Sequence, residues 1–386
     1  MPAVTPVAGA GFLARALAGK LAGDSVEPGE WDEMLRGLPH NVTTEMDLEL
    51  WALATRIRAD AAAAGALREA TPALLAHRYT TRDLPPKLQQ GLESFLTRHG
   101  HRAVAEIDVG MPRWSDDPTY VLGVLTNYLR LEDPDLAPNV QFSRGSRVAQ
   151  SAVLGLVSRV RRRSRLRAAA VRWSLGRARE LVGMRETHKD YLVRVLAQVR
   201  EQLAVVGSEL AEAGVLATSE DIFFLDLVQA RAALAGTDMH AVVAQRREDY
   251  QRELRRRQVP RIMLSDGTQP EALASPDHEP AAGQLTGTPA SAGTVTGTAR
   301  VVLDPVGAHL EPGEILVAPS TDPGWTPLFL TAGGLVMEMG GANSHGAVVA
   351  REYGIPAVVG VPDATLCITT GQQITVAGAT GLVELH

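Results

Sequence analysis

The stretch Met339-Gly-Gly-Ala-Asn-Ser-His-Gly-Ala-Val-Val-Ala-Arg-Glu-Tyr-Gly-Ile-Pro-Ala-Val-Val-Gly360 decides the fold of the last part of this chain. It predicts a glycine-rich turn, a short helix that begins near His345, and an apolar strand. Gly340 and Gly341 lack a Cβ atom and permit a tight turn, and Ser344 is expected to cap the helix. His345 then lies among the unpaired N–H groups of the first turn, which stabilise an anion. A neutral imidazole is a good nucleophile toward phosphorus, although a histidine packed at a helix start is the simpler alternative.

Short strands surround this motif and predict a compact β/β/α domain from about residue 284 to the end. A short helix is expected to start at Pro327, with Thr326 as its cap, because proline has no N–H to leave unpaired there. The strands are expected in apolar runs separated by Gly, Pro and Asp, over residues 294–303, 313–318, 334–337, 355–359, 373–376 and 381–385.

The composition changes along the 386 residues and predicts more than one domain. Residues 1–265 are rich in Ala, Leu, Arg and Glu at helical spacing, with long helices expected over about 148–181 and 190–213. Residues 266–283 are polar and Pro-rich, which is typical of a linker that lets the following domain move. The expected fold class is therefore multidomain, α and α/β, with a mostly helical N-terminal domain followed by a β/β/α domain over residues 284–386.

Charge and composition argue against several classes of protein. The formal net charge of −6 argues against a nucleic-acid coat, and the basic run from Arg159 to Arg167 is expected to be a solvated helix face. The one cysteine, Cys367, excludes an internal disulfide and fits a reducing cytoplasm. No apolar span reaches the roughly 18 residues that a membrane helix needs, and no signal peptide is recognisable. We therefore expect a cytoplasmic protein without nucleic-acid or membrane partners, and the scarcity of lysine suggests a bacterial one.

Two polar patches interrupt the helical part. The first, from Arg98 to Pro118, mixes histidines, carboxylates and arginines around a glycine-interrupted loop, a mixture able to bind an anion and move a proton. A buried ion-pair network is the alternative, and a metal site at His99 and His101 is not expected because no clear third ligand accompanies them. The second patch, from Gly183 to Tyr191, is either a substrate site or a charge cluster at a helix start.

These motifs resemble the PEP-utilising enzymes and, within them, the rifamycin phosphotransferase-like proteins. Gly-Gly-x-x-Ser-His, then Ala-Arg-Glu and Gly-Ile-Pro-Ala-Val-Val-Gly, is the pattern of their swivelling phosphohistidine domain. The two patches resemble Gly-His-Arg-x-x-x-Glu-x-Asp, Pro-Arg-Trp-x-x-Asp-Pro and Arg-Glu-x-x-Lys of their substrate-binding domain. Residues 37–46 resemble their Gly-Leu-Pro-x-Asn-x-Thr-Thr-Glu-Met, although Thr43 or Thr44 capping a helix explains these residues without a substrate.

The resemblance implies a phosphotransferase with a phosphohistidine intermediate on a swivelling domain. His345 would carry the phosphoryl group, and His101 or Glu106 would be the base for an acceptor hydroxyl. The phosphate would be held by Gly340, Gly341, Ser344, Gly346 and Arg351, although an ion pair at a surface or domain interface is equally open for Arg351. The substrate would be bound by Arg102, Asp108, Arg113, Trp114, Arg185 and Lys189.

The resemblance also implies a phosphoryl donor. Family members place an ATP-grasp domain before these two units, and no glycine-rich phosphate loop followed by lysine occurs in this sequence. We therefore expect ATP and Mg²⁺ on a separate subunit or a missing N-terminal domain, with no metal site and no cofactor intrinsic to this chain. The acceptor is expected to be a hydroxyl of a small molecule such as an antibiotic or a biosynthetic intermediate. A dehydratase that phosphorylates a hydroxyl and then eliminates phosphate, and a non-catalytic binding protein, are the alternatives.

Overall fold

The computed structural model describes residues 4–27, 29–255, 263–268, 283–305, 308–321, 325–341 and 344–386. The chain divides into two compact units. Unit 1 contains Met1–Ala105, Arg113–Val193 and Ala282–His386, and unit 2 contains Glu106–Pro112 and Arg194–Ala281. Unit 1 therefore combines most of the N-terminal helices with the C-terminal sheet domain. The predicted linker over 266–283 lies outside the described residues except for 266–268 and 283.

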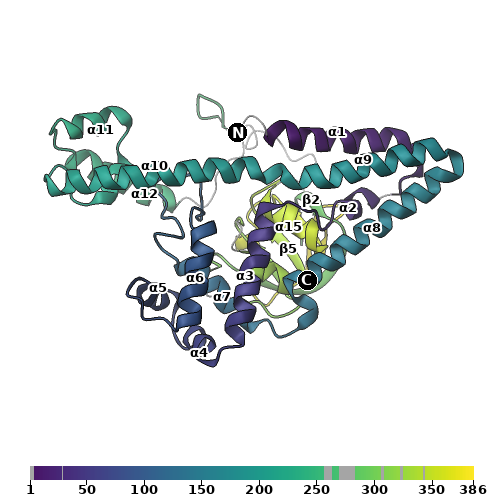
Figure 1. The fold of residues 1–386 in the computed structure, drawn as a ribbon, viewed down its shortest axis with the longest axis horizontal. Helices are drawn as coiled ribbons and strands as arrows, with labels where there is room; N and C mark the ends of the chain where they lie inside the picture. Colours follow the sequence, from purple (N-terminus) through teal and green to yellow (C-terminus); the bar gives the residue numbers. More distant parts are fainter. Residues whose placement is uncertain are drawn as a thin grey trace. The chain divides into compact units, whose positions relative to one another are not determined.

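Helices build the N-terminal part of unit 1 in two groups (Figure 1). The first group packs around one apolar cluster that includes the fully buried Leu53, Leu88 and Leu122; it consists of α3 (Val42–Arg58), α4 (Ala61–Glu69), α5 (Pro72–Thr80), α6 (Pro86–His99) and α7 (Thr119–Arg130). The second group packs around Met34, Leu156 and Val171; it consists of α1 (Val4–Ala22), α2 (Glu30–Met34), α8 (Pro138–Arg163) and α9 (Arg165–Gly183). None of the helices in the described residues is long and apolar enough to cross a membrane.

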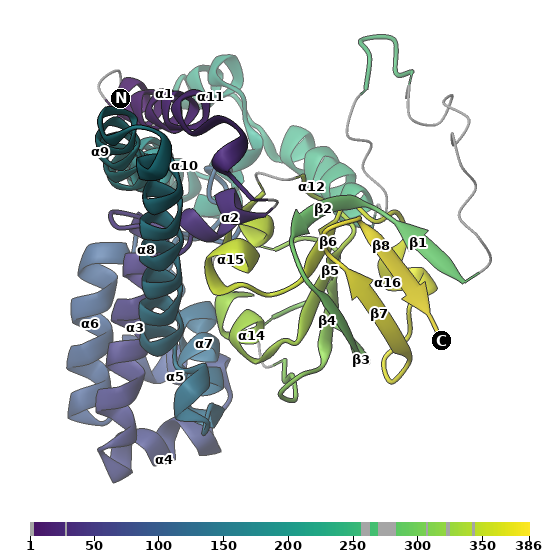
Figure 2. The same ribbon diagram turned by 90° about the vertical axis from the view of Figure 1, so that its right-hand side faces the viewer.

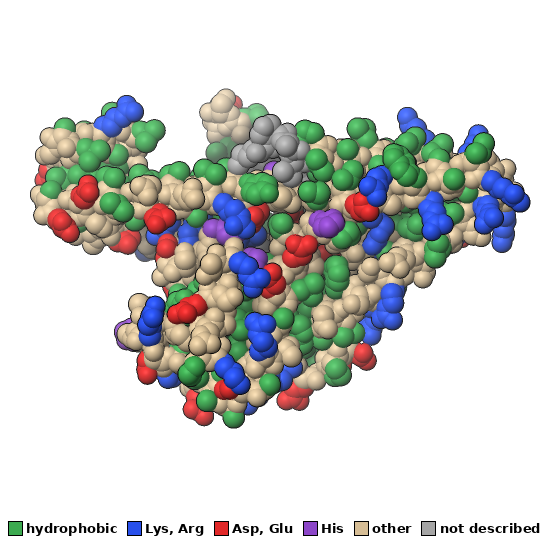
Figure 3. Space-filling model, in the orientation of Figure 1, with side chains coloured by type: hydrophobic (Ala, Val, Ile, Leu, Met, Phe, Trp, Pro, Cys, Tyr) green, Lys and Arg blue, Asp and Glu red, His purple; other side chains and the backbone are tan. Residues whose placement is uncertain are grey.

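The single helix predicted over 148–181 is wrong, because the chain breaks at Ser164 into α8 and α9. Ser164 adopts an extended backbone, and its side chain accepts the backbone N–H of Arg167 to cap α9. The continuous Ala/Leu/Arg pattern hides this break, since one serine is its only local signal. Basic side chains gather at the end where α8 turns into α9 (Figure 3), and Arg161–Arg163 are exposed there. The basic run is therefore a solvated surface at a helix end, as predicted.

The C-terminal domain is an eight-stranded sheet with the order β1-β8-β7-β3-β4-β5-β6-β2. The central strands β3 to β6 run parallel, and the strands that flank them are antiparallel. The strand bounds are β1 (Gln284–Thr286), β2 (Thr288–Ser291), β3 (Thr294–Val301), β4 (Ile315–Ala318), β5 (Gly334–Met337), β6 (Ala357–Val359), β7 (Gln373–Ala377) and β8 (Leu382–Leu385). The six predicted strands are thus present, while β1 and β2 were not predicted.

Alternate residues of the parallel strands bury opposite faces of the sheet. On β4, Ile315 and Val317 join one apolar cluster, whereas Leu316 and Ala318 join the other. The second cluster is covered by α14 (Thr326–Thr331) and α15 (His345–Tyr353), which lie on the side of the sheet that faces α7 and α8 (Figure 2). A third short helix, α16 (Ala364–Cys367), packs near β4. The α14 helix starts at Thr326, with Trp325 rather than Thr326 at the cap position.

Unit 2 is a small helical unit with its own apolar core. Its core residues include Leu210, Leu216, Ile222 and Met239. The helix predicted over 190–213 is α10 (Thr187–Glu212), whose first turns belong to unit 1. The remaining elements are the 3₁₀ helix η4 (Ser219–Phe224), α11 (Leu227–Leu234) and α12 (His240–Leu254). The mostly helical N-terminal part followed by a sheet domain confirms the expected fold class.

Candidate functional site

The glycine-rich turn places His345 at the first residue of α15. Gly340 has a φ of +122°, and a Cβ atom there would lie 2.7 Å from the Ser344 hydroxyl oxygen, so this position requires glycine. Ser344 holds the cap position, but its hydroxyl donates to the Gly341 carbonyl oxygen (2.9 Å) instead of capping the helix. The expected side-chain cap is therefore wrong, because the turn uses that hydroxyl for itself.

Two further motif residues hold α15 tightly on the sheet domain. Gly346 is buried, and a Cβ atom there would overlap the side chains of Thr321 and Met337. Arg351 donates from Nη1 to the carbonyl oxygen of Ala290 in β2 (2.9 Å), so its guanidinium ties the helix to the edge strand. This bond lies within the domain and is not an ion pair, so both the phosphate role of Arg351 and the interface ion pair stay predictions.

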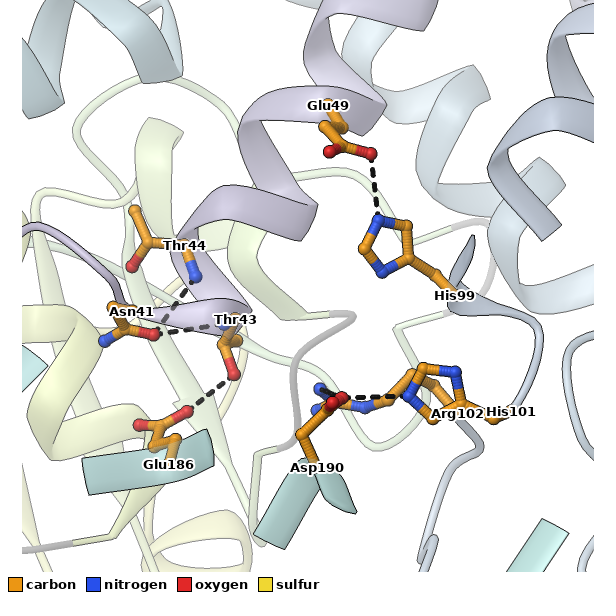
Figure 4. Close-up of polar contacts among 9 residues, drawn as sticks. All are labelled: Asn41, Thr43, Thr44, Glu49, His99, His101, Arg102, Glu186 and Asp190. Carbon is orange, nitrogen blue, oxygen red and sulfur yellow. Dashed lines mark hydrogen bonds and ion pairs between the residues drawn. The ribbon is translucent and has the colours of Figure 1, made fainter. Parts of the chain in front are cut away.

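Glu186 is the carboxylate that interacts electrostatically with His345. It lies in the 3₁₀ helix η3 (Met184–Glu186), and its Oε2 accepts the hydroxyl of Thr43 (2.5 Å) (Figure 4). Burial opposes ionisation of Glu186, yet its pKa is below the usual value because the charge of His345, the Thr43 hydrogen bond, Arg185 and Arg102 together outweigh burial. The motif histidine thus acts on a carboxylate of the helical part whose charge Arg185 and Arg102 also stabilise.

A second carboxylate, Glu352 of α15, is buried against the start of α3. Its Oε1 accepts Nδ2 of Asn41 (3.0 Å), its Oε2 accepts the Thr44 hydroxyl (2.8 Å), and Nη2 of Arg185 lies 3.6 Å from Oε1. Burial raises the pKa of Glu352, although Arg185, Thr44 and Asn41 partly offset this effect. Asn41 also caps α3 by accepting the backbone N–H groups of Thr43 and Thr44 (Figure 4). The predicted helix start is present, but Asn41 is the cap, not Thr43 or Thr44.

The first polar patch contains two histidine–carboxylate pairs within unit 1 (Figure 4). Nε2 of His101 lies 2.8 Å from Oδ1 of Asp190, and Nη1 of the buried Arg102 lies 3.6 Å from the same oxygen. Nε2 of His99 lies 2.9 Å from Oε2 of Glu49. Each histidine thus has its own carboxylate partner, which agrees with the alternative of a polar network that holds helices and loop together. A histidine held by a buried carboxylate is also the usual arrangement of a general base.

Asp47 forms a buried network with two tyrosines. Its Oδ1 accepts the Tyr128 hydroxyl, and its Oδ2 accepts the hydroxyl of Tyr353 at the end of α15 (3.3 Å). Burial raises the pKa of Asp47 to about 7, against the lowering effect of both hydrogen bonds. Burial also raises the pKa of both tyrosines. The network joins the helical part of unit 1 to α15.

The other predicted substrate residues are spread over different environments. Arg113 is buried, and Trp114 is a core residue stacked between Phe95 and Tyr120, with ring centroids 6.4 Å and 5.9 Å away. Lys189 is exposed at the start of α10. Glu106 and Asp108 belong to unit 2, where Glu106 is buried and Asp108 accepts the backbone N–H of Gly110. Their roles toward a substrate remain predictions.

The site includes residues that sequence reasoning missed. Asp190 lies in the second polar patch and Glu352 in the motif of His345, but nothing local distinguishes a buried carboxylate from one on a solvated helix face. Asp47 follows the motif of residues 37–46 directly and carries no signal of its own. Among the described residues, no three His, Cys, Asp or Glu side chains lie close enough together to hold a metal ion.

Comparison with protein families identifies two regions of this chain. Residues 3–186 match the family model of the rifampicin phosphotransferase fourth domain. Residues 310–381 match the family model of the PEP-utilising enzyme mobile domain, which includes the glycine-rich turn, His345 and α15. The two matches therefore cover both parts of unit 1.

Comparison with individual proteins gives relatives along most of the chain. The rifampicin phosphotransferases of Streptomyces sviceus and Bacillus subtilis are 35% and 32% identical to it, over 92% of this chain and 41% of their own length. The prodigiosin synthesizing transferase PigC of Serratia marcescens is 32% identical over 77% of this chain and 33% of its own length. The chain thus spans less than half the length of the curated relatives it matches.

Proposed function

Because this chain belongs to the rifampicin phosphotransferase-like PEP-utilising enzymes over both matched regions, we propose that it is the acceptor-binding and phosphocarrier part of an ATP-dependent phosphotransferase. His345 takes a phosphoryl group from ATP, which is held with Mg²⁺ on an ATP-grasp domain, and passes it to a hydroxyl of a small molecule. The antibiotic named by the relatives is one candidate for that molecule.

The observation that supports this proposal best is the position of His345. The imidazole stands at the first residue of α15 and interacts with Glu186, while Arg185 and Arg102 act on the same carboxylate. Phosphoryl transfer depends on placement and on neutralising the charge of the phosphate oxygens, which arginines and a helix start supply. A histidine that interacts with a carboxylate, on which two guanidinium groups also act, fits this requirement.

The transfer divides into two steps on this chain. In the first step a nitrogen of His345 attacks phosphorus, so that a P–N bond forms while the P–O bond to the donor breaks. In the second step the acceptor oxygen attacks the same phosphorus, a new P–O bond forms, and the electrons of the P–N bond return to the imidazole. The proton of the acceptor hydroxyl goes to His101, whose ring the buried carboxylate of Asp190 holds in place.

A second candidate is a biosynthetic reaction in which the phosphorylated hydroxyl then leaves as phosphate. The similarity to a prodigiosin synthesizing transferase favours a role in natural-product synthesis. The pair of His101 and Asp190 would then remove a carbon-bound proton, while the C–O bond breaks and a double bond forms. The two candidates differ in the substrate-derived product, because transfer leaves the phosphoryl group on the substrate oxygen, whereas elimination gives a dehydrated substrate.

The decisive experiment is intact-protein mass spectrometry under non-acidic conditions. The chain is mixed with ATP, Mg²⁺ and the purified ATP-grasp domain of a rifampicin phosphotransferase. A gain of one phosphoryl group is expected in wild type and in the control His309→Ala, which changes an exposed histidine of the same domain paired with Glu311. The gain should be absent in His345→Ala. An unmodified wild-type mass with a competent donor would refute the carrier role.

A further inference from the structure

The end of α15 opposite to His345 makes the polar contacts that join the C-terminal domain to the helices of unit 1. Glu352 is 5% exposed, and both its oxygens are engaged by side chains of α3 and its cap. Tyr353 follows with its hydroxyl on Asp47. Two consecutive residues of one helix thus contact side chains more than 300 positions away in the sequence.

The carboxylate of Glu352 is favoured by the helix that it contacts, α3, and disfavoured by the helix that contains it, α15. Glu352 lies in the last turn of its own helix, where the helix dipole disfavours negative charge. Asn41, however, marks the start of α3, where the dipole favours negative charge and where Thr44 and Asn41 itself donate hydrogen bonds. Arg185 adds a cation 3.6 Å away. The groups that offset the burial of this carboxylate therefore lie across the interface and not within its own domain.

Apolar contacts accompany this polar contact. Leu330 of α14 is 5% exposed and belongs to the apolar cluster of α3 to α7, although it comes from the C-terminal domain. Tyr353 packs against that cluster and against the core of its own domain. On α8, a Cβ atom added at Gly145 would lie 3.1 Å from the carbonyl oxygen of Glu352, so the two backbones approach closely. The interface therefore has an apolar part and a charged centre.

The spacing along α15 connects this contact to the histidine. His345 and Glu352 are seven residues apart, which is two turns or about 10 Å, so both lie on the same face of the helix. Two adjacent residues of the helical part interact with this face: Arg185 lies near Glu352, and Glu186 interacts electrostatically with His345. When α15 is held at Glu352, His345 is therefore held in one position relative to Glu186.

We propose that Glu352 is the docking residue of the C-terminal domain: it recognises the N-terminal turn of α3 and thereby sets His345 against Glu186. The partner that this surface fits is the helical part of the same chain. The inference rests on the proposed carrier role, because a domain that never leaves the acceptor site needs no docking contact. Glu352 touches no reacting atom and acts by positioning His345.

A distance measurement between the two domains tests the docking role. Cys367, the one cysteine of the chain, is exposed on the C-terminal domain, and Leu74→Cys on α5 replaces a half-exposed residue. Fluorophores on this pair report docked and undocked populations by single-molecule energy transfer, in the full chain without nucleotide. Glu352→Gln should lower the docked-to-undocked ratio about tenfold or more, since the amide nitrogen cannot accept one of the two hydrogen bonds and the attraction to Arg185 is lost.

Two further variants make the result specific. Glu314→Gln changes another carboxylate of the C-terminal domain, which pairs with Arg300 inside that domain (2.7 Å), and it should leave the ratio unchanged. Thr44→Val removes one donor from the helical side. It should lower the ratio in wild type, but have a smaller effect in the Glu352→Gln background, because the two side chains share one hydrogen bond.

The outcomes separate this inference from the proposed function. Circular dichroism and a thermal melt first establish that Glu352→Gln is folded. Only then is its docked-to-undocked ratio compared with that of wild type. An unchanged ratio in folded Glu352→Gln, or one fixed distance in every variant, overturns the docking role whatever the phosphorylation result. A lowered ratio together with an unmodified His345 in the mass assay supports the docking contact and removes the carrier function.

Discussion

The Asp47→Asn substitution is expected to stabilise the protein above neutral pH and to remove a pH dependence. Asp47 is 3% exposed, and burial raises its pKa from 3.8 to about 7. An acid with a higher pKa in the folded state binds its proton more tightly there. Folding is therefore favoured as the pH falls from about 7 toward 3.8, and the charged carboxylate destabilises the folded state above about 7.

The magnitude follows from the two pKa values. At about 1.4 kcal/mol per pH unit, the difference between 3.8 and about 7 corresponds to roughly 4 kcal/mol for a fully buried group. Between pH 5 and pH 8 the wild type should lose about 3 kcal/mol through this group. Asparagine has the same shape and can still pair with Tyr128 and Tyr353. It carries no charge at any pH, so the free energy of unfolding of the variant has no pH-dependent contribution from this position.

The assay is urea unfolding of wild type and Asp47→Asn at pH 5, 6, 7 and 8. Glu352 and His99 also have perturbed pKa values, but they are present in both proteins and cancel in the difference. The free energy of unfolding of the variant minus that of wild type should be about 3 kcal/mol larger at pH 8 than at pH 5. Asp83→Asn, at a side chain 72% exposed, is the control and should stay within about 0.5 kcal/mol of wild type. A difference that is constant across this pH range would refute the reasoning.

Three further perturbations have expected outcomes. Gly346→Ala should lower the free energy of unfolding by about 1–3 kcal/mol because its Cβ atom meets filled space, whereas Gly341→Ala meets open space and should change it by less than about 0.5 kcal/mol in the same urea titration. Leu330→Ala should cost about 2–5 kcal/mol because its side chain is buried among the helices; an effect as small as that of Leu366→Ala, at a 55% exposed site, would contradict its place in that core. His101→Gln should slow transfer from phosphorylated His345 to the acceptor at least about 10²-fold, as measured by rapid quench, and equal slowing of His345 phosphorylation would exclude His101 as the acceptor base.

The strands that could be predicted are those whose signal is local. The buried runs of β4 and β5 carry four apolar or small residues each and begin close after a glycine, and their predicted bounds agree with the structure within about two residues. By contrast, β1 and β2 have little apolar character, and they are strands because β8 and β6 provide partners for their backbone groups. The break at Ser164 was missed for a similar reason, since its α8–α9 turn is stabilised by packing of the two helices against each other.

The sequence by itself determined the motif of His345, because the glycines, the helix start and the histidine are contiguous and their geometry follows from backbone rules. It also determined the order of a helical part and a sheet domain, since hydrophobic periodicity is a property of neighbouring residues. Only the tertiary structure decided which charges meet. His101 pairs with Asp190 across 89 positions and Glu352 with Asn41 across 311. Such pairs depend on the path of the chain between them, so a carboxylate that local pattern assigns to a solvated face becomes a buried partner only when distant helices close around it.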